Sequence, residues 1–148
     1  MQSAPSKLQA VDQPSTRPEW YKPPQRPIAE IIADLSKPIP SKYLDTRRQG
    51  NTNLTYLPWY NAVKLLDRCT GGHWDYSIGN IHTTSDRIFL TARITIHSAE
   101  NTFHREASGT ELLNCGSYGD PSSNAESMAL RRCAAKFGLA LYLYEKDN

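Results

Sequence analysis

Apolar side chains recur every three or four residues in two stretches of the first half of the chain. The first stretch, 28–35, ends before Pro38 and Pro40, and the second, 59–69, follows Pro58. This spacing is typical of amphipathic helices, and proline suits the first position of a helix. We therefore expect a short helix over 28–35 and a longer one that begins at Pro58.

The longer helix has two unlike sides. Trp59 begins its apolar stripe, and we expect this side chain to belong to the core. Asn61, Lys64 and Arg68 fall on the other side, which we expect to be solvated. Tyr60 is equally compatible with a core position and with an exposed one.

The apolar period shortens to two residues between 74 and 113. Apolar and polar side chains alternate over 74–78 and 88–97, and more weakly over 102–113, with the turn formers TTSD and SAEN between them. This alternation predicts three strands in an antiparallel meander with one buried face. Such a face needs a helix to cover it.

The last helix is predicted after the polar loop NCGSYGDPSSN. Ser123 and Glu126 have the spacing of a capping box, which places the start of the helix at Ser123. Gly138 is suited to end it. The apolar run LALYLY that follows, 139–144, is expected to pack as an extended or strand-like segment.

The order of elements is helix, loop, helix, three-stranded meander and helix, which predicts an α+β domain over 28–148. Residues 1–27 hold six of the ten prolines and few aliphatic side chains. Such a segment buries too little apolar surface to offset its ordering entropy, so we expect a disordered lead-in. The formal net charge of +2 lies in this lead-in, because 28–148 holds thirteen basic and thirteen acidic residues. A neutral domain binds a polyanion only through a placed patch.

Several functions are disfavoured by the motif content. Three cysteines, an odd number, favour free thiols in a reducing compartment, and the four histidines are too scattered for a metal site. The chain has no P-loop, GxSxG, HExxH or supported carboxylate pair. We therefore predict no catalytic residue, no metal and no cofactor. With no apolar run of membrane-span length and no leader pattern, we expect a cytoplasmic protein in a bacterial or phage setting, or a nuclear one in a eukaryote.

The basic residues carry a stronger functional signal. On the last helix Arg132 and Lys136 fall roughly opposite the apolar side, and Arg131 projects from its flank. Arg47 and Arg48 sit in a polar loop or on a strand edge. The small neighbours of the helical arginines would let a phosphate backbone approach, and guanidinium groups bind phosphate in a forked geometry.

Further candidates stand on or before the second helix. Lys64 lies on its polar side, while Tyr56, Trp59 and Tyr60 are candidates for stacking on bases. Taken one at a time, each of these residues is also compatible with an ordinary solvated charge or a core aromatic.

Five strings in this order resemble the Rad52 and DdrA group of single-strand annealing proteins over about 28–148. They are YLDTR, YLPWYNAVKLLD, GGHWDYSI, FHREASGTE and, most specifically, SNAESMALRRCAAKFGLALYLYEKD. The resemblance implies a β-β-β-α core that assembles into a homo-oligomeric ring. It also implies single-stranded DNA in an outer basic groove and ATP-independent annealing in recombinational repair.

The resemblance also implies site residues and partners. Arg131 and Arg132 match the basic pair on the family's final helix, and Arg47 matches an arginine in an early loop. This chain departs from the family at Asn61, where relatives carry a basic residue, and at Ala135, which is followed by Lys136. Lys64 is the substitute for the first of these, and a recombinase or a single-strand binding protein is the protein partner to expect.

Two other function classes share parts of this pattern. A double-stranded RNA binding module also sets three strands against helices, but its lysines stand at the start of the last helix, where this chain has Ser-Asn-Ala-Glu. The other class is an oligomeric scaffold without nucleic acid, in which Arg131 and Arg132 form ion pairs between subunits.

Overall fold

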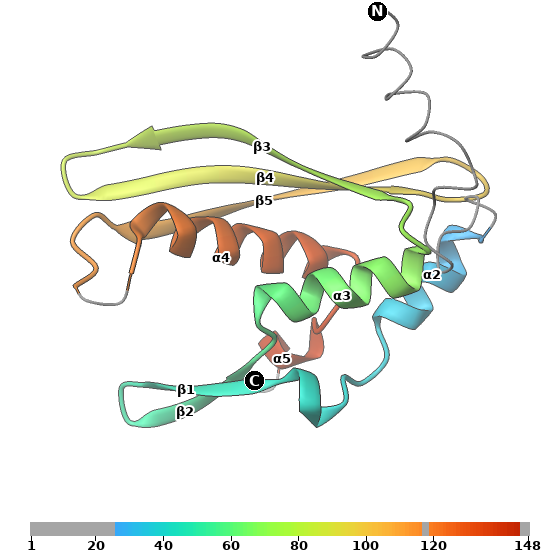
Figure 1. Cartoon of the computed structure of the whole chain (residues 1–148), viewed down its shortest axis with the longest axis horizontal. Coiled ribbons are helices and arrows are strands. Elements are labelled where there is room, and N and C mark those ends of the chain that lie inside the picture. Colours follow the sequence, from blue (N-terminus) through green and yellow to red (C-terminus); the bar gives the residue numbers. More distant parts are fainter. Residues whose placement is uncertain (1–25, 117–118, 146–148) are drawn as a thin grey trace, which may run out of the picture.

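A three-stranded antiparallel sheet and one long helix are the main layers of the computed structural model, which describes residues 26–116 and 119–145. The strands β3 (Trp74–Thr83), β4 (Arg87–His97) and β5 (Thr102–Leu112) lie side by side in chain order. The helix α4 (Pro121–Lys136) runs under this sheet, mainly against β4 and β5 (Figure 1). The predicted meander, its covering helix and the α+β class are confirmed.

The core lies between the sheet and α4. Alternate residues of β4 are buried, from Ile88 to Ile96, as its period of two predicts. On β5 a glycine permits the close approach of the helix. A Cβ atom added at Gly109 would lie 1.9 Å from the carbonyl oxygen of Ala125 on α4.

Two further helices extend this core on the side of α4 away from the sheet. α2 (Ile28–Leu35) and α3 (Trp59–Thr70) have the predicted positions, and α3 packs against both α2 and α4 (Figure 1). α3 ends at Thr70, because Gly71 after it takes the left-handed conformation with a φ of 66°. Pro58 is the N-cap of α3, so the helix begins at Trp59, one residue later than predicted.

The buried side of α3 is rotated relative to the prediction. Its buried stripe passes through Asn61, Ala62, Leu66 and Thr70. The expectation that Trp59 belongs to the core is wrong, since this side chain is 50% exposed. Asn61 is buried and not solvated, because its amide Nδ2 donates a 2.9 Å hydrogen bond to the carbonyl of Tyr43.

A β-hairpin that periodicity did not predict precedes α3. β1 (Asp45–Gln49) pairs with β2 (Thr52–Tyr56), and the short turn η2 (Ser41–Tyr43) leads into it. The hairpin lies on the far side of the helices from the three-stranded sheet (Figure 1). Arg47 and Arg48 therefore belong to a strand of a two-stranded sheet, which agrees with the strand-edge alternative.

The start of α4 differs from the predicted capping box. Asp120 is the N-cap, and its carboxylate accepts the amide N–H of Ser122, while Pro121 opens the helix. Ser123 lies inside the helix. Glu126 accepts the phenolic O–H of Tyr76 at 3.0 Å, so this acid joins α4 to β3 and caps nothing.

The end of the chain also differs from the prediction. Gly138 breaks α4 as expected, with a φ of 110°. The run after it is not extended, because Leu139 to Leu141 form turns and α5 (Tyr142–Glu145) follows. Backbone hydrogen bonds such as Leu143 N–H to Ala140 C=O make this segment helical.

Arg26, counted with the lead-in, is part of the fold. Its guanidinium donates to the carbonyl of Cys69 at 2.6 Å and pairs with Asp34 at 2.5 Å. The rest of the predicted lead-in, except Pro27, lies outside the described residues. Cys69, Cys115 and Cys133 are free thiols, as predicted.

Candidate nucleic-acid interface

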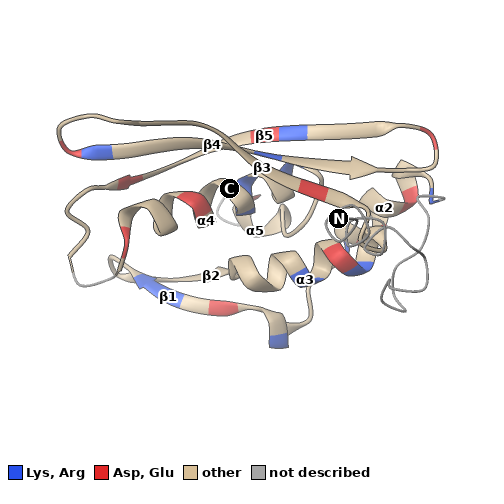
Figure 2. Ribbon diagram, turned by 45° about the horizontal axis from the view of Figure 1, so that its top comes forward, with Lys and Arg blue, Asp and Glu red and all other residues tan. Residues whose placement is uncertain are grey.

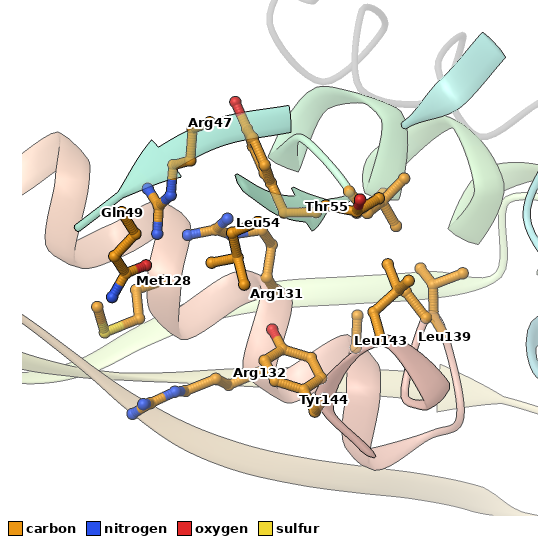
Figure 3. Close-up of a pocket in the computed structure, with 15 residues that line it drawn as sticks. Arg47, Gln49, Leu54, Thr55, Met128, Arg131, Arg132, Leu139, Leu143 and Tyr144 are labelled. Carbon is orange, nitrogen blue, oxygen red and sulfur yellow. The ribbon is translucent and has the colours of Figure 1, made fainter. Parts of the chain in front are cut away.

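A pocket of about 260 Å³ lies between the β1–β2 hairpin and the helices α4 and α5, and we call it the hairpin pocket (Figure 3). Its floor is apolar and includes Leu54, Leu57, Leu139 and Leu143. Polar and aromatic side chains complete the lining. They are Arg47, Gln49, Thr55, Tyr56, Arg131, Arg132 and Tyr144.

Two arginines share one aromatic ring in this pocket. The guanidinium carbon of Arg47 lies 5.3 Å from the ring centroid of Tyr56, and that of Arg131 lies 5.5 Å from it. Arg47 and Tyr56 stand on the two paired strands of the hairpin, while Arg131 comes from the last third of α4. Both distances are within the range of cation–π attraction, which orients the two guanidinium groups against the ring.

Arg131 is half-buried, and its surroundings oppose its charge. Burial is the main effect on its guanidinium and lowers the pKa. The charges of Arg47 and Arg132 lower this pKa further, whereas Tyr144 and Tyr56 act to raise it. Its Nε donates to the carbonyl of Ser127 at 3.1 Å. Among residues 26–116 and 119–145, neither Arg47 nor Arg131 forms an ion pair with a carboxylate. Two neighbouring cations without a counter-charge favour the binding of an anion.

The predicted patch on the last helix is divided by the tertiary structure. Arg132 lines the pocket but is exposed, and one of its guanidinium nitrogens donates to the carbonyl of Ser108 at 3.4 Å. Lys136 is outside the pocket, and its Nζ donates to the carbonyl of Glu106 at 2.6 Å. Both carbonyls belong to β5, an edge strand of the sheet. Figure 3 shows Arg132 extending away from the Arg47–Arg131 pair.

The other predicted site residues lie elsewhere. Arg48 follows Arg47 on β1, so its side chain points to the opposite face of the hairpin, and it does not line the pocket. Lys64 and Tyr60 are exposed on α3 and are also absent from the lining. The structure thus brings together three of the seven predicted residues: Arg47, Arg131 and Arg132.

Several pocket residues escaped sequence reasoning. Tyr144 was assigned to an extended apolar run, but the turns after Gly138 bring it to the pocket. Gln49 and Met128 carry no motif that marks them. Among the aromatic residues of the pocket, Tyr56 was marked by the sequence, as a candidate for stacking on bases just before the second helix.

Basic residues lie on both sides of the molecule. Figure 2 shows blue segments on β1, on the turn before it and on α3 along the lower side of that view, and further blue segments on β4 and β5 along its upper side. No group of three or more His, Cys, Asp or Glu side chains that would hold a metal ion occurs within the described ranges. The helices of that part of the chain are also too short or too polar to cross a membrane.

Comparisons with known proteins find relatives among DNA repair proteins. Residues 27–148 match the model of a family described as Rad52/22 family double-strand break repair protein. The chain is 32% identical over 124 residues to the Arabidopsis thaliana protein named DNA repair RAD52-like protein 1, mitochondrial; the match covers 82% of this chain and 70% of that protein. It is equally similar to DNA repair RAD52-like protein 2, chloroplastic, of the same plant, and there it covers 62% of the relative.

Proposed function

The chain belongs to the Rad52/22 family of double-strand break repair proteins, and we propose that it serves repair by binding single-stranded DNA and annealing complementary strands. The reaction makes and breaks no covalent bond. It needs no nucleoside triphosphate, which agrees with a sequence that has no P-loop. We therefore propose a binding protein and not an enzyme.

The pair of Arg47 and Arg131 around Tyr56 carries this proposal. Each guanidinium presents a planar set of N–H donors that fits the oxygens of a phosphate. Each phosphate that is neutralised releases a counterion, and this release drives binding at moderate salt. Because Tyr56 holds both groups in place, they meet the phosphate with little loss of side-chain entropy.

Annealing follows from the kind of contact that these groups make. Phosphate contacts position a strand without reading its sequence, so the base edges remain free for a complementary strand. The backbone of the strand would pass over the hairpin pocket, between Arg47 on β1 and Arg131 and Arg132 on α4. Lys136 is proposed as an outer contact for a neighbouring phosphate, whereas Arg48 on the opposite face of the hairpin lies off this path.

Assembly into a ring is the second part of the proposal. One chain offers few cations, and its folded part is neutral overall. Repeating the Arg47–Arg131 pair around a homo-oligomer makes binding multivalent, which raises the effective concentration of each next contact. A recombinase or a single-strand binding protein remains the predicted partner.

The test compares a double variant, which carries both Arg47→Ala and Arg131→Ala, with the unchanged chain. Fluorescence anisotropy with a labelled single-stranded oligonucleotide is measured over a series of salt concentrations. We expect at least a tenfold loss of affinity, since a hydrogen bond to a charged group contributes about 1.5–3 kcal/mol. Annealing of complementary oligonucleotides without ATP should slow in parallel.

The matched control is Lys37→Ala with Arg93→Ala. It removes the same charge from two cations that pair with Asp34 and Glu106 on other parts of the surface. Equal losses in both double variants would indicate bulk charge and contradict the pocket assignment. Stronger binding of duplex RNA than of single-stranded DNA would favour an RNA-binding module, and assembly at low salt without any nucleic-acid binding would favour a scaffold.

A further inference from the structure

A second group of basic and aromatic residues lies on α3, apart from the hairpin pocket. Tyr60, Lys64 and Arg68 follow one another at intervals of four residues, and all three are exposed. At 1.5 Å per residue they form a line about 12 Å long on one side of the helix. We call this line the α3 ridge.

The α3 ridge faces away from the hairpin pocket. Ala62, which lines that pocket, is fully buried. Lys64 stands two residues later, about 200° around the helix, and Tyr60 stands two residues earlier, about 200° in the other sense. A group bound on the ridge therefore lies on the opposite side of α3 from Arg47 and Arg131.

A tyrosine from the turn before the hairpin completes this surface. Arg68 donates a 2.8 Å hydrogen bond from its guanidinium to the hydroxyl of Tyr43, and its guanidinium carbon is 5.9 Å from the ring centroid. The Nζ of Lys42 is 5.2 Å from the same centroid. The backbone of Tyr43 is held in turn by the amide of Asn61. Tyr43 thus contacts both Lys42 of the turn and Arg68 at the end of the ridge.

These cations form no ion pair. Within the part of the chain that the structure describes, Lys42, Lys64 and Arg68 have no carboxylate oxygen within ion-pair distance. The acid next to Arg68 in sequence, Asp67, is directed to Trp74, whose indole N–H its carboxylate accepts at 2.6 Å.

Exposed aromatic rings stand at the other end of the ridge. Trp59 and Tyr60 are each 50% exposed and pack edge to face, with their ring centroids 5.9 Å apart. Large aromatic side chains that remain exposed beside unpaired cations are typical of surfaces that bind single strands. There the bases stack on the rings and the cations follow the phosphates.

We propose that the α3 ridge, together with Trp59, Tyr43 and Lys42, is a second contact surface for single-stranded nucleic acid. This inference rests on the proposed function, since it assumes a chain that binds single strands. Its ligand is a strand segment whose bases stack on Trp59 and Tyr60. The phosphates of that segment contact Lys64, Arg68 and Lys42. The segment is either the continuation of the strand in the hairpin pocket or part of a second strand.

Photocrosslinking locates the contacts directly. The full chain is irradiated with an oligonucleotide that carries bromodeoxyuridine, and the crosslinked peptides are identified by mass spectrometry. We expect crosslinks in the peptide that contains Trp59 and Tyr60 as well as at Tyr56 in the pocket. If each chain binds one strand, the ridge contacts the same strand as the hairpin pocket. If each chain binds more than one strand, the ridge contacts a second strand.

Substitution provides the independent readout. Lys42→Ala with Lys64→Ala should lower the salt dependence of binding by about 1.4, since each contact to a single strand contributes about 0.7 to the slope of log K against log salt. Both lysines are exposed, so the thermal unfolding temperature should not change. The control Lys37→Ala with Arg93→Ala should leave the slope unchanged.

The outcomes separate the two proposals. An unchanged slope, with crosslinks confined to Tyr56 and Tyr144, overturns the α3 ridge and leaves the pocket intact. Crosslinks on α3 alone support the ridge and contradict the pocket assignment. A chain that binds no single-stranded DNA under any of these conditions contradicts both.

Discussion

Arg131 and Cys133 are two residues apart on α4, yet they meet different surroundings. Arg131 is half-buried at the edge of the hairpin pocket, where it keeps one side open to solvent. Cys133 is fully buried beneath the sheet, and its Sγ donates to the carbonyl of Ala92 at 3.0 Å. Side chains of one helix thus meet the pocket or the core according to the face from which they project.

The thiol of Cys133 should therefore be unreactive in the folded protein. Burial raises the pKa of this thiol, which lowers the fraction of thiolate, and the thiolate is the reactive form. We expect iodoacetamide at pH 8 to modify Cys115, which is half-buried, before Cys133. Cys133 should react fully only in denaturant. Equal rates of modification at the two residues, measured by mass spectrometry, would contradict the packing of α4 under the sheet.

The elements pack around one hydrophobic core, and close backbone approach and short side-chain links fix their relative positions. Gly109 lets α4 rest on β5, and Tyr76 links β3 to α4 through Glu126. At the other end, a Cβ atom added at Gly138 would lie 2.2 Å from the hydroxyl oxygen of Ser36, just after α2. These contacts set the position of α4, and with it the position of Arg131.

Gly109→Ala is the direct test of this packing. The added methyl would collide with backbone atoms of Ala125, which cannot rotate away, so α4 must shift. Overpacking of this kind costs about 1–3 kcal/mol, and we expect a loss of that size in chemical denaturation. In the control Gly79→Ala the nearest atom is the hydroxyl of the Thr91 side chain at 2.8 Å, which can turn. A larger loss at Gly79 than at Gly109 would contradict this account.

The element types follow closely from the sequence, whereas their boundaries and small elements do not. The helix over 28–35 and the three strands were predicted because their periodicity is strong. The hairpin was missed because 45–56 is polar and lacks an alternating apolar face. The start of α4 was misplaced because Asp120 and Ser123 are both good caps, and only the fold shows which amide groups they meet.

At the scale of the whole molecule, the distribution of charge is more informative than its sum. The folded part is neutral, but two groups of its cations without an ion pair lie around the hairpin pocket and along the α3 ridge, while others such as Arg87 and Arg105 lie on the sheet. The acids are engaged elsewhere, as in the pairs Arg26–Asp34 and Arg93–Glu106. A ring of such chains would present two lines of cations on opposite sides of α3.

The proposed ring requires that the chain associates with itself in solution, so its measured size should be that of an oligomer. We expect mass photometry or light scattering to give an oligomer of defined size at moderate salt. A short single-stranded oligonucleotide should join that oligomer in proportion to the number of chains. Substitution of Arg47 and Arg131 should remove the oligonucleotide and leave the oligomer intact, because the pocket is formed within one chain. A monomer that ignores DNA would contradict the proposed function.

The sequence by itself determined the class of each main element, the α+β class and the resemblance to an annealing family. Periodicity carries this information because it reflects contacts between near neighbours in the chain. Through that resemblance the sequence also assigned Arg47, Arg131 and Arg132 to one basic groove, together with four residues that lie outside the hairpin pocket.

Only the tertiary structure decided which of the basic residues lie together. Arg47 and Arg131 meet on Tyr56 because the hairpin folds back against the end of α4, a contact between segments that are far apart in the chain. Lys64 and Tyr60 lie on the exposed side of α3, because Asn61, Ala62, Leu66 and Thr70 form its buried side. Such contacts depend on packing between elements, and the pattern of residues within one element does not contain them.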